Sequence, residues 1–120
     1  MLVSPEVVVA AMTPDGWEQR MPGLQVKVLW EKAPGGAAIT LVKFDKGAGI
    51  PEPHVHASNQ FMYCLSGRYE YLPNNMVLEP GAFYWNPKDH EHGPTVAHEE
   101  SILLEIYDGQ RFYERPSYLQ

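Results

Sequence analysis

The feature that most limits the fold of this chain is a series of short apolar and aromatic runs, each closed by glycine or proline. Residues 24–31 alternate apolar and polar side chains, a period of two that is typical of strands, and residues 38–45 are expected as the returning strand. The two consecutive glycines of APGGA, between these runs, favour a hairpin turn. Eleven prolines and ten glycines interrupt the 120 residues, which favours an all-β domain over a helical bundle.

Further strands are expected after this hairpin. Many short strands with turns between them indicate a sandwich or a barrel, and the order of the elements alone does not choose between the two. The segment VVVAAM near the N-terminus is a candidate for a short helical turn, or for an edge strand exchanged with a second subunit. The expected strands are 60–67 and 68–73, joined by a Ser-Gly turn, a short one within 74–81, then 82–87 and 101–108.

Charge, the lengths of apolar runs and cysteine content exclude several classes of protein. A net charge of −6 gives no electrostatic support for binding nucleic acid. No apolar run approaches ~18 residues, so we expect no membrane-spanning helix, and the N-terminus lacks the basic start of a signal peptide. The single cysteine, Cys64, excludes an internal disulfide framework and fits a reducing compartment. We therefore expect one domain, residues 1–120, in the cytoplasm.

The stretch PEPHVHASNQFMYCLSG carries the densest chemistry of the chain. Side chains alternate faces along an extended segment, so His54 and His56 point the same way, and Gln60 has the same parity. The loop NPKDHEHGP offers His90 and His92. One H-x-H pair in a polar loop is commonly solvated, but two pairs beside proline-bounded strands make a divalent metal site the better hypothesis.

These two groups resemble the two motifs of the cupins, a family of small jelly-roll barrels. The first family motif has glycine, H-x-H, an acid and a second glycine, and the second has glycine, proline, glycine and histidine. The resemblance covers the central third of the chain, and it departs from the pattern where an amide replaces the acid and an aspartate replaces a glycine. The matching residues are Gly49, His54, His56, Gln60 and Gly67, then Gly81, Pro87, Asp89 and His92.

The resemblance implies an all-β cupin jelly-roll barrel (a double-stranded β-helix). Its metal-binding core would span about 38–108, and the tail 109–120 would pack on the barrel or on a partner subunit. It also implies a homodimer. The implied metal ligands are His54, His56, Gln60 and His92, because the register of the second motif selects His92 over His90.

Gln60 stands where the family usually has glutamate. A neutral amide leaves a bound ion its full charge of +2, which favours an anionic ligand on that ion. Imidazole ligands suit zinc, copper, iron and nickel alike. The resemblance favours Fe²⁺, with Zn²⁺, Ni²⁺, Mn²⁺ and Cu²⁺ as alternatives.

Two groups of cupins are especially similar to this chain. The acetylacetone and dihydroxyacetophenone dioxygenases are small cupins with histidine-rich iron sites, and the pectin-degradation cupins, which act on unsaturated uronates, combine three histidines with a glutamine. Either implies a metal-dependent enzyme that acts on a small oxygenated metabolite, with an Fe(II)-dependent dioxygenase favoured. The alternatives are a non-redox Lewis-acid isomerase or ring-opening enzyme, and a non-catalytic metal-binding or ligand-binding module.

Strand parity suggests which side chains line the pocket. If Gln60 faces inward, Met62 and Cys64 do so too, as either lining or core. The same rule places Tyr84 and Asn86 inside, where Tyr84, or His90 from the next loop, could transfer a proton. The expected substrate contacts are Met62, Tyr84, Asn86 and Glu105.

Two further expectations concern the outer face of the strands. Glu105 lies in an apolar run and is either a buried acid able to act as a base or, as we favour, an exposed residue on one strand face. Tyr63, Tyr69 and Tyr71 share the parity opposite to Gln60, so they are expected to pack between sheets or at a dimer contact.

Overall fold

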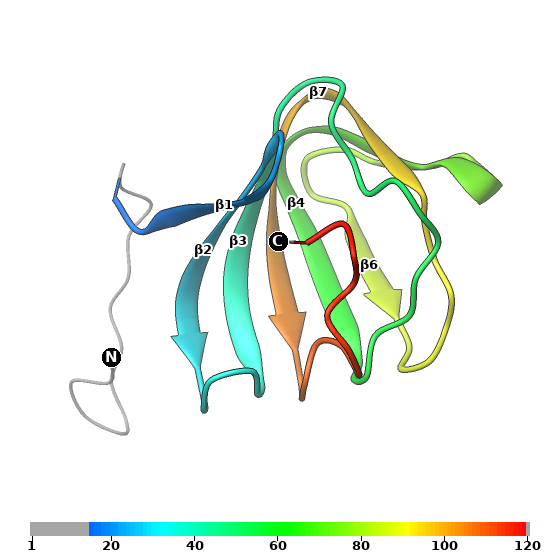
Figure 1. The fold of residues 1–120 in the computed structure, drawn as a ribbon. Helices are drawn as coiled ribbons and strands as arrows, with labels where there is room; N and C mark the ends of the chain where they lie inside the picture. The colour runs from blue at the N-terminus through cyan, green and yellow to red at the C-terminus, as the bar shows by residue number, and fades with distance from the viewer. Residues whose placement is uncertain (1–14, 120) are drawn as a thin grey trace.

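The protein folds as a curved antiparallel sheet with loops and the C-terminal tail across one face (Figure 1). The computed structural model describes residues 15–119. The strands are β1 (Trp17–Met21), β2 (Leu24–Glu31), β3 (Ala38–Phe44), β4 (Gln60–Tyr71), β5 (Met76–Leu78), β6 (Phe83–Asn86) and β7 (Thr95–Tyr107), with a 3₁₀ turn, η1, at Leu72–Asn74.

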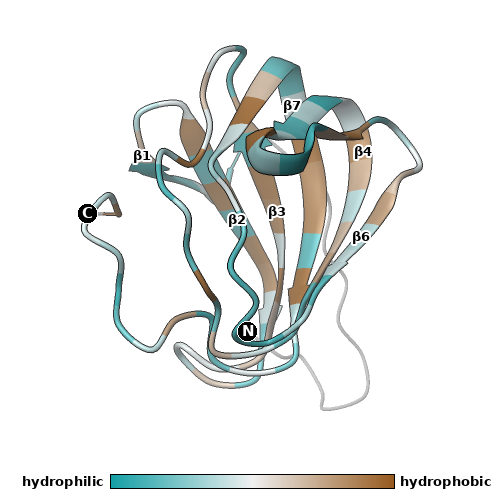
Figure 2. Ribbon diagram, turned by 90° about the vertical axis from the view of Figure 1, so that its right-hand side faces the viewer, coloured by the Kyte–Doolittle hydropathy of each residue, from teal (hydrophilic) through white to brown (hydrophobic). Residues whose placement is uncertain are grey.

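The strands follow the order β1-β2-β3-β7-β4-β5, and β6 also pairs with β4. The all-β prediction is confirmed, and the fold is that of a cupin jelly roll in which the sheet does not close within the described residues. Figure 2 shows apolar residues along the central strands, and the loops and tail lie to one side of them. None of the helical structure within residues 15–119 has the length or apolar character needed to cross a membrane.

The β2–β3 hairpin forms where the sequence predicts it. Both strands begin at the expected residues, Leu24 and Ala38. The Lys32 amide donates to the carbonyl of Ala37 at 2.9 Å and closes the turn. Gly35 has φ +77°, a left-handed conformation that glycine adopts without steric cost.

The predicted Ser-Gly turn is wrong, because residues 60–71 form one long strand. Register shifts between Cys64 and Tyr69 keep β4 paired with β7 on both sides of the irregularity. Gly67 has φ +92° there, and a Cβ on it would lie 2.3 Å from the carbonyl oxygen of Glu100. A glycine that reads as a turn in the sequence therefore serves a β-bulge.

The bulge also reverses the parity of β4. Gln60, Met62 and Cys64 are buried, and the next buried side chains are Tyr69 and Tyr71. The expectation that these two tyrosines face away from Gln60 is wrong, since both belong to the core and line the same cavity as Gln60. For Tyr63, which is 42% exposed, the outward orientation is correct.

The sequence predicted neither the start of β7 nor the strand β1. β7 begins at Thr95, six residues before the apolar run at 101–108, because its polar first half pairs with the far end of β4. β1 was not expected, and it pairs with β2 from Trp17 to Met21. The segment VVVAAM lies outside the described residues.

Replacing Gly67 with alanine is predicted to destabilise the protein much more than replacing Gly35. Both glycines have a positive φ, which costs an alanine about 1–2 kcal/mol. Only Gly67 adds an overlap with backbone, while a Cβ on Gly35 meets nothing within 4 Å. We expect Gly67→Ala to lower the free energy of unfolding by about 3 kcal/mol or more, as measured by denaturant unfolding. Equal losses for the two variants would contradict the bulge argument.

Candidate metal centre

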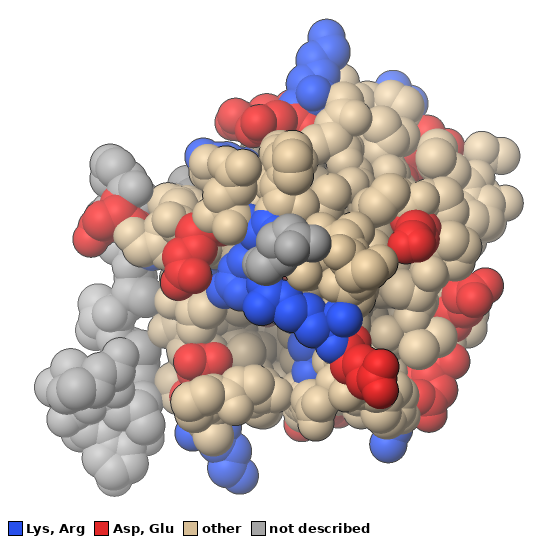
Figure 3. All heavy atoms as spheres, in the orientation of Figure 1, with Lys and Arg blue, Asp and Glu red and all other residues tan. Residues whose placement is uncertain are grey.

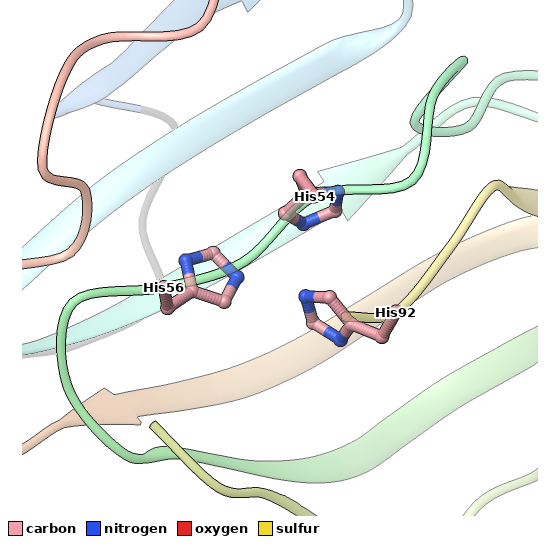
Figure 4. Close-up of side chains that lie close together, drawn as sticks. All are labelled: His54, His56 and His92. Carbon is pink, nitrogen blue, oxygen red and sulfur yellow. The ribbon is translucent and has the colours of Figure 1, made fainter. Parts of the chain in front are cut away.

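Three histidines from two loops converge at the inner side of the sheet. His54 and His56 lie in the segment before β4, and His92 lies between β6 and β7. Their potential ligand atoms lie within 4.8 Å of one another, and Figure 4 shows the three rings turned toward a common space. This is an arrangement that could hold a metal ion.

A backbone contact fixes two of these histidines side by side. The amide of His54 donates to the carbonyl of His92, and the amide of His92 donates to the carbonyl of His54, each at 2.9 Å. Residues that exchange both hydrogen bonds in an antiparallel pair project their side chains to the same face. The ring centroids of His54 and His92 are accordingly 4.3 Å apart.

The ring nitrogens are arranged as metal ligands require. Nδ1 of His54 bonds the carbonyl of Glu52, and Nδ1 of His56 bonds the carbonyl of Arg111, both at 3.1 Å. Because a carbonyl only accepts, these contacts place the proton on Nδ1 and leave the Nε2 lone pair free. Nε2 of His56 and both ring nitrogens of His92 are buried without a hydrogen-bond partner among the described residues.

Burial keeps these imidazoles neutral. Desolvation lowers the pKa of His56 to about 3, and the proximity of His54 acts in the same direction. Desolvation, together with His54, His56 and His90, lowers the pKa of His92 to about 2. The pKa of His54 is also lowered, mainly by desolvation. At neutral pH all three rings therefore carry lone pairs rather than charge, which is the state that binds a divalent ion.

Gln60 presents an oxygen to the same cavity. Its Nε2 donates to Oε2 of Glu105 and to the hydroxyl of Tyr107, both at 2.9 Å. These two contacts orient the amide and leave Oε1 buried, with no partner in the described part of the chain. An amide oxygen held in this way suits a hard divalent ion as a fourth ligand.

The neighbour of Gln60 explains why an amide stands where cupins usually have an acid. Glu105 is only 7% exposed, so the expectation of an exposed position is wrong. Its Oε1 accepts from Nη2 of Arg111 at 3.1 Å, and its Oε2 accepts from Gln60. A glutamate at position 60 would set two carboxylates against each other in a buried place, which is strongly unfavourable.

One cavity of about 280 Å³ contains this cluster. Met62 and Glu105 line it, and their contact with a substrate stays a prediction. Its walls are apolar side chains of β2 and β3, and aromatic side chains of the tail cover it on one side: His56 and Phe112 have ring centroids 5.0 Å apart. The apolar lining limits the water around the histidines.

Three other predicted residues lie elsewhere. Tyr84 and His90 line a second cavity, of about 180 Å³, which shares Tyr71 and His92 with the first. Asn86 is fully buried, and its Oδ1 contacts Nδ1 of His90 at 2.9 Å. The catalytic role of Tyr84 and His90, and the substrate contacts of Tyr84 and Asn86, stay predictions that these positions do not favour.

The spacing of the second motif brings His92 to the cluster, although Asp89 stands where the family has a glycine. Asp89, in the place of a glycine, has φ +66°, a left-handed conformation that aspartate tolerates better than most residues. Its amide donates to the carbonyl of His56 at 3.1 Å. Asp89 thus links the loop of His92 to the loop of His56.

Sequence reasoning missed two residues beside Gln60. Tyr107 has the same strand parity as Glu105, so the alternation along 101–108 could have indicated it. Arg111 belongs to the irregular tail, and nothing in its neighbours in the sequence indicates that it returns to the cavity. Its carbonyl holds His56 while its side chain holds Glu105.

Comparison with known proteins identifies the family. A family model described as the ChrR cupin-like domain matches residues 5–111, so the chain belongs to this cupin family. No curated protein matches the sequence.

Solved structures show the same fold. KdgF from Halomonas sp. is similar at 29% identity and a TM-score of 0.68, over 81% of this chain and 87% of that one. An acetylacetone dioxygenase from Acinetobacter johnsonii has 12% identity and a TM-score of 0.71, over 82% and 72%. A structure of Rhodobacter sphaeroides SigE with the anti-sigma ChrR has 19% identity and a TM-score of 0.69, over 82% and 52%. The last two likenesses, below 25% identity, show the fold alone.

Substitution of His92 is predicted to remove metal, and substitution of His90 is not. His92 directs unpartnered nitrogens into the cluster, whereas His90 contacts Asn86. We expect His92→Ala to lower metal affinity at least 100-fold and His90→Ala to change it less than threefold. Titration with Zn²⁺ against a competing chelator measures both. Equal losses would show that the ligand register is wrong.

Exchanging the amide and the acid of the Gln60–Glu105 contact is predicted to cost less stability than the sum of the two single substitutions. Gln60→Glu alone loses a charge-assisted hydrogen bond and opposes two carboxylates, at a cost of about 2–3 kcal/mol. Glu105→Gln alone removes the carboxylate that Arg111 holds. The double variant Gln60→Glu/Glu105→Gln restores a donor facing an acceptor, so its loss should be smaller than the sum of the two single losses by about 1 kcal/mol or more. Denaturant unfolding of the metal-free proteins at pH 8 measures all three variants; additive losses would contradict the assignment.

Proposed function

We propose that this protein is a metal-dependent cupin enzyme that catalyses a non-redox proton transfer, such as a keto–enol isomerisation or a ring opening, on a small oxygenated metabolite. The observation that carries this proposal is the juxtaposition of a buried carboxylate, Glu105, with three neutral imidazoles in one cavity. A carboxylate beside a Lewis-acid site is the arrangement that abstraction of a proton next to a carbonyl requires.

The donor set fits a divalent ion. His54, His56, His92 and Oε1 of Gln60 would hold it: the ligand atoms of the three imidazoles lie within 4.8 Å of one another, and the free atoms of His56, Gln60 and His92 are buried without a partner among the described residues. When bound, the ion supplies polarisation of a substrate carbonyl or hydroxyl. All four donors are neutral, so the ion keeps its charge and stabilises negative charge on the substrate oxygen.

Glu105 is the group proposed to move the proton. It lines the cavity and is buried, so its Oε2 can take a proton from a substrate carbon once the substrate displaces or shares the contact with Gln60. Arg111, at 3.1 Å from Oε1, orients the carboxylate through a charge-assisted hydrogen bond. The hydroxyl of Tyr107, held by Gln60, lies beside the same carboxylate and completes its polar surroundings.

The resemblances support this reading. The glutamine among three histidines is similar to the pattern of the pectin-degradation cupins, which act on unsaturated uronates. KdgF from Halomonas sp. has a similar fold and is 29% identical in sequence to this chain over the matched region. A uronate-type substrate has both a carbonyl or hydroxyl for the ion and an acidic hydrogen for a base.

A second candidate is an Fe(II)-dependent dioxygenase, the function that the sequence resemblance favours. The histidine-rich donor set suits Fe²⁺, and the fold is similar to an acetylacetone dioxygenase with a TM-score of 0.71. This chemistry makes no use of Glu105 as a base. The two candidates therefore differ in what they require of that residue.

Two measurements on protein purified without chelator separate the candidates. The first is the metal content, followed by loading with Zn²⁺ or, anaerobically, with Fe²⁺. The second follows loss of unsaturated uronates and hydrogen–deuterium exchange beside their carbonyl groups by NMR, and oxygen uptake with β-diketones and aromatic hydroxyketones. Turnover with zinc and without oxygen supports the proposal. Iron-dependent oxygen uptake supports the dioxygenase, and bound metal without either reaction supports a binding module.

Glu105→Gln is predicted to lower the rate constant kcat for the exchange reaction about 100-fold or more, while the metal content stays within twofold of wild type. The variant keeps the size of the side chain and removes the base. Steady-state NMR assays with a parallel metal analysis measure the two effects. An unchanged kcat with full metal occupancy would exclude Glu105 as the base.

A further inference from the structure

Arg20 enters the cavity through an irregularity in the edge strand β1. The pairing of β1 with β2 runs through Gln19↔Gln25 and Met21↔Leu24, with a register shift between them, so Arg20 has no opposite residue. A bulge of this kind lets two consecutive side chains point to the same face. Met21 packs against the core, and Arg20 lines the cavity that contains the histidines.

The guanidinium of Arg20 is only loosely satisfied. Its Nε is buried with no hydrogen-bond partner among the described residues. Its Nη2 forms an ion pair with Oε2 of Glu18 at 3.9 Å, and that side chain is 72% exposed. Arg111, by contrast, holds Glu105 at 3.1 Å. A partly buried arginine with a free donor is positioned to receive an anion from the cavity.

The charge of the cavity has the opposite sign to that of the protein. Three arginines and two glutamates line it, which gives +1 before any metal ion is counted, whereas the whole chain carries −6. Figure 3 shows basic side chains gathered near the centre of the face crossed by the tail, with acidic side chains around its edges. A positive cavity in an acidic protein concentrates anions at that place.

We propose that Arg20 binds a carboxylate of the substrate, at a subsite separate from the metal ligands. This inference rests on the proposed function and names its substrate class: a short organic acid whose oxygenated end reaches the histidine cluster and whose carboxylate meets Arg20. The apolar side chains of β2 and β3, such as Val26 and Val42, line the cavity as well and receive the carbon chain of the acid. Arg20 thereby determines specificity rather than chemistry.

The test uses pairs of 2-oxo acids that differ only in a distal carboxylate. 2-Oxopentanoate and 2-oxoglutarate have five carbons, and 2-oxohexanoate and 2-oxoadipate have six, so two chain lengths are sampled. Their dissociation constants are measured by calorimetry with zinc-loaded wild type, Arg20→Met and Arg68→Met. Arg68 is an exposed arginine outside the cavity lining, and its substitution removes the same charge from the protein.

In wild type and Arg68→Met, the diacid is expected to bind at least tenfold more tightly than its partner at one chain length or both. In Arg20→Met this advantage should fall below twofold, while affinity for the monoacids stays unchanged. No advantage at either length, or an advantage that survives in Arg20→Met, would overturn the subsite.

The same titrations with metal-free protein separate this inference from the proposed function. If the Arg20-dependent advantage of the diacids persists without zinc, that result supports the subsite. If zinc raises the affinity for none of the four acids, that result counts against the metal-dependent function and not against the subsite. Zinc-dependent binding of all four acids without any effect of Arg20→Met overturns the subsite and leaves the metal-dependent function standing.

Discussion

The pairing of β4 with β7 is the interaction on which the site depends. It sets Gln60 opposite Tyr107 and Met62 opposite Glu105, so four side chains of one face meet at the end of the two strands. From this register follow the two hydrogen bonds of the Gln60 amide and the direction of its oxygen. A shift of either strand by one residue would turn its two side chains to the outer face and separate them from the two of its partner.

Two β-bulges, around Gly67 and at Arg20, point side chains into the cavity that a regular strand would direct to the other face. The bulge around Gly67 turns Tyr69 and Tyr71 inward, where the Tyr71 hydroxyl contacts Sδ of Met62 at 3.1 Å. The bulge at Arg20 brings a cation into an apolar wall next to Met21. Bulges are common beside functional sites because a bulge redirects a side chain while leaving only one residue of the strand unpaired.

Local pattern predicted much of the fold and part of the site. Alternation located β2, the glycine turn after it located β3, and motif spacing brought His54, His56 and His92 together as candidates, because these signals are short-range or linear along the chain. The predicted turn at Ser66-Gly67 failed because a glycine with positive φ serves a turn and a bulge equally well. Arg111 could not be found, since only the path of the irregular tail returns its carbonyl to His56 and its side chain to Glu105.

The amide at position 60, where the family usually has an acid, affects both the charge of the site and the chemistry available there. A glutamate at position 60 would bring a negative charge to a bound metal ion. Here Gln60 is neutral, and the acid, Glu105, accepts a hydrogen bond from Gln60 and another from Arg111. The carboxylate is thereby kept apart from the proposed donor atoms, as its proposed role as a base requires. An ion on four neutral ligands would keep its positive charge and, together with Arg20 in the cavity wall, would favour anionic ligands. Moving one carboxylate from ligand to neighbour therefore changes both the chemistry available and the class of molecule that the cavity attracts.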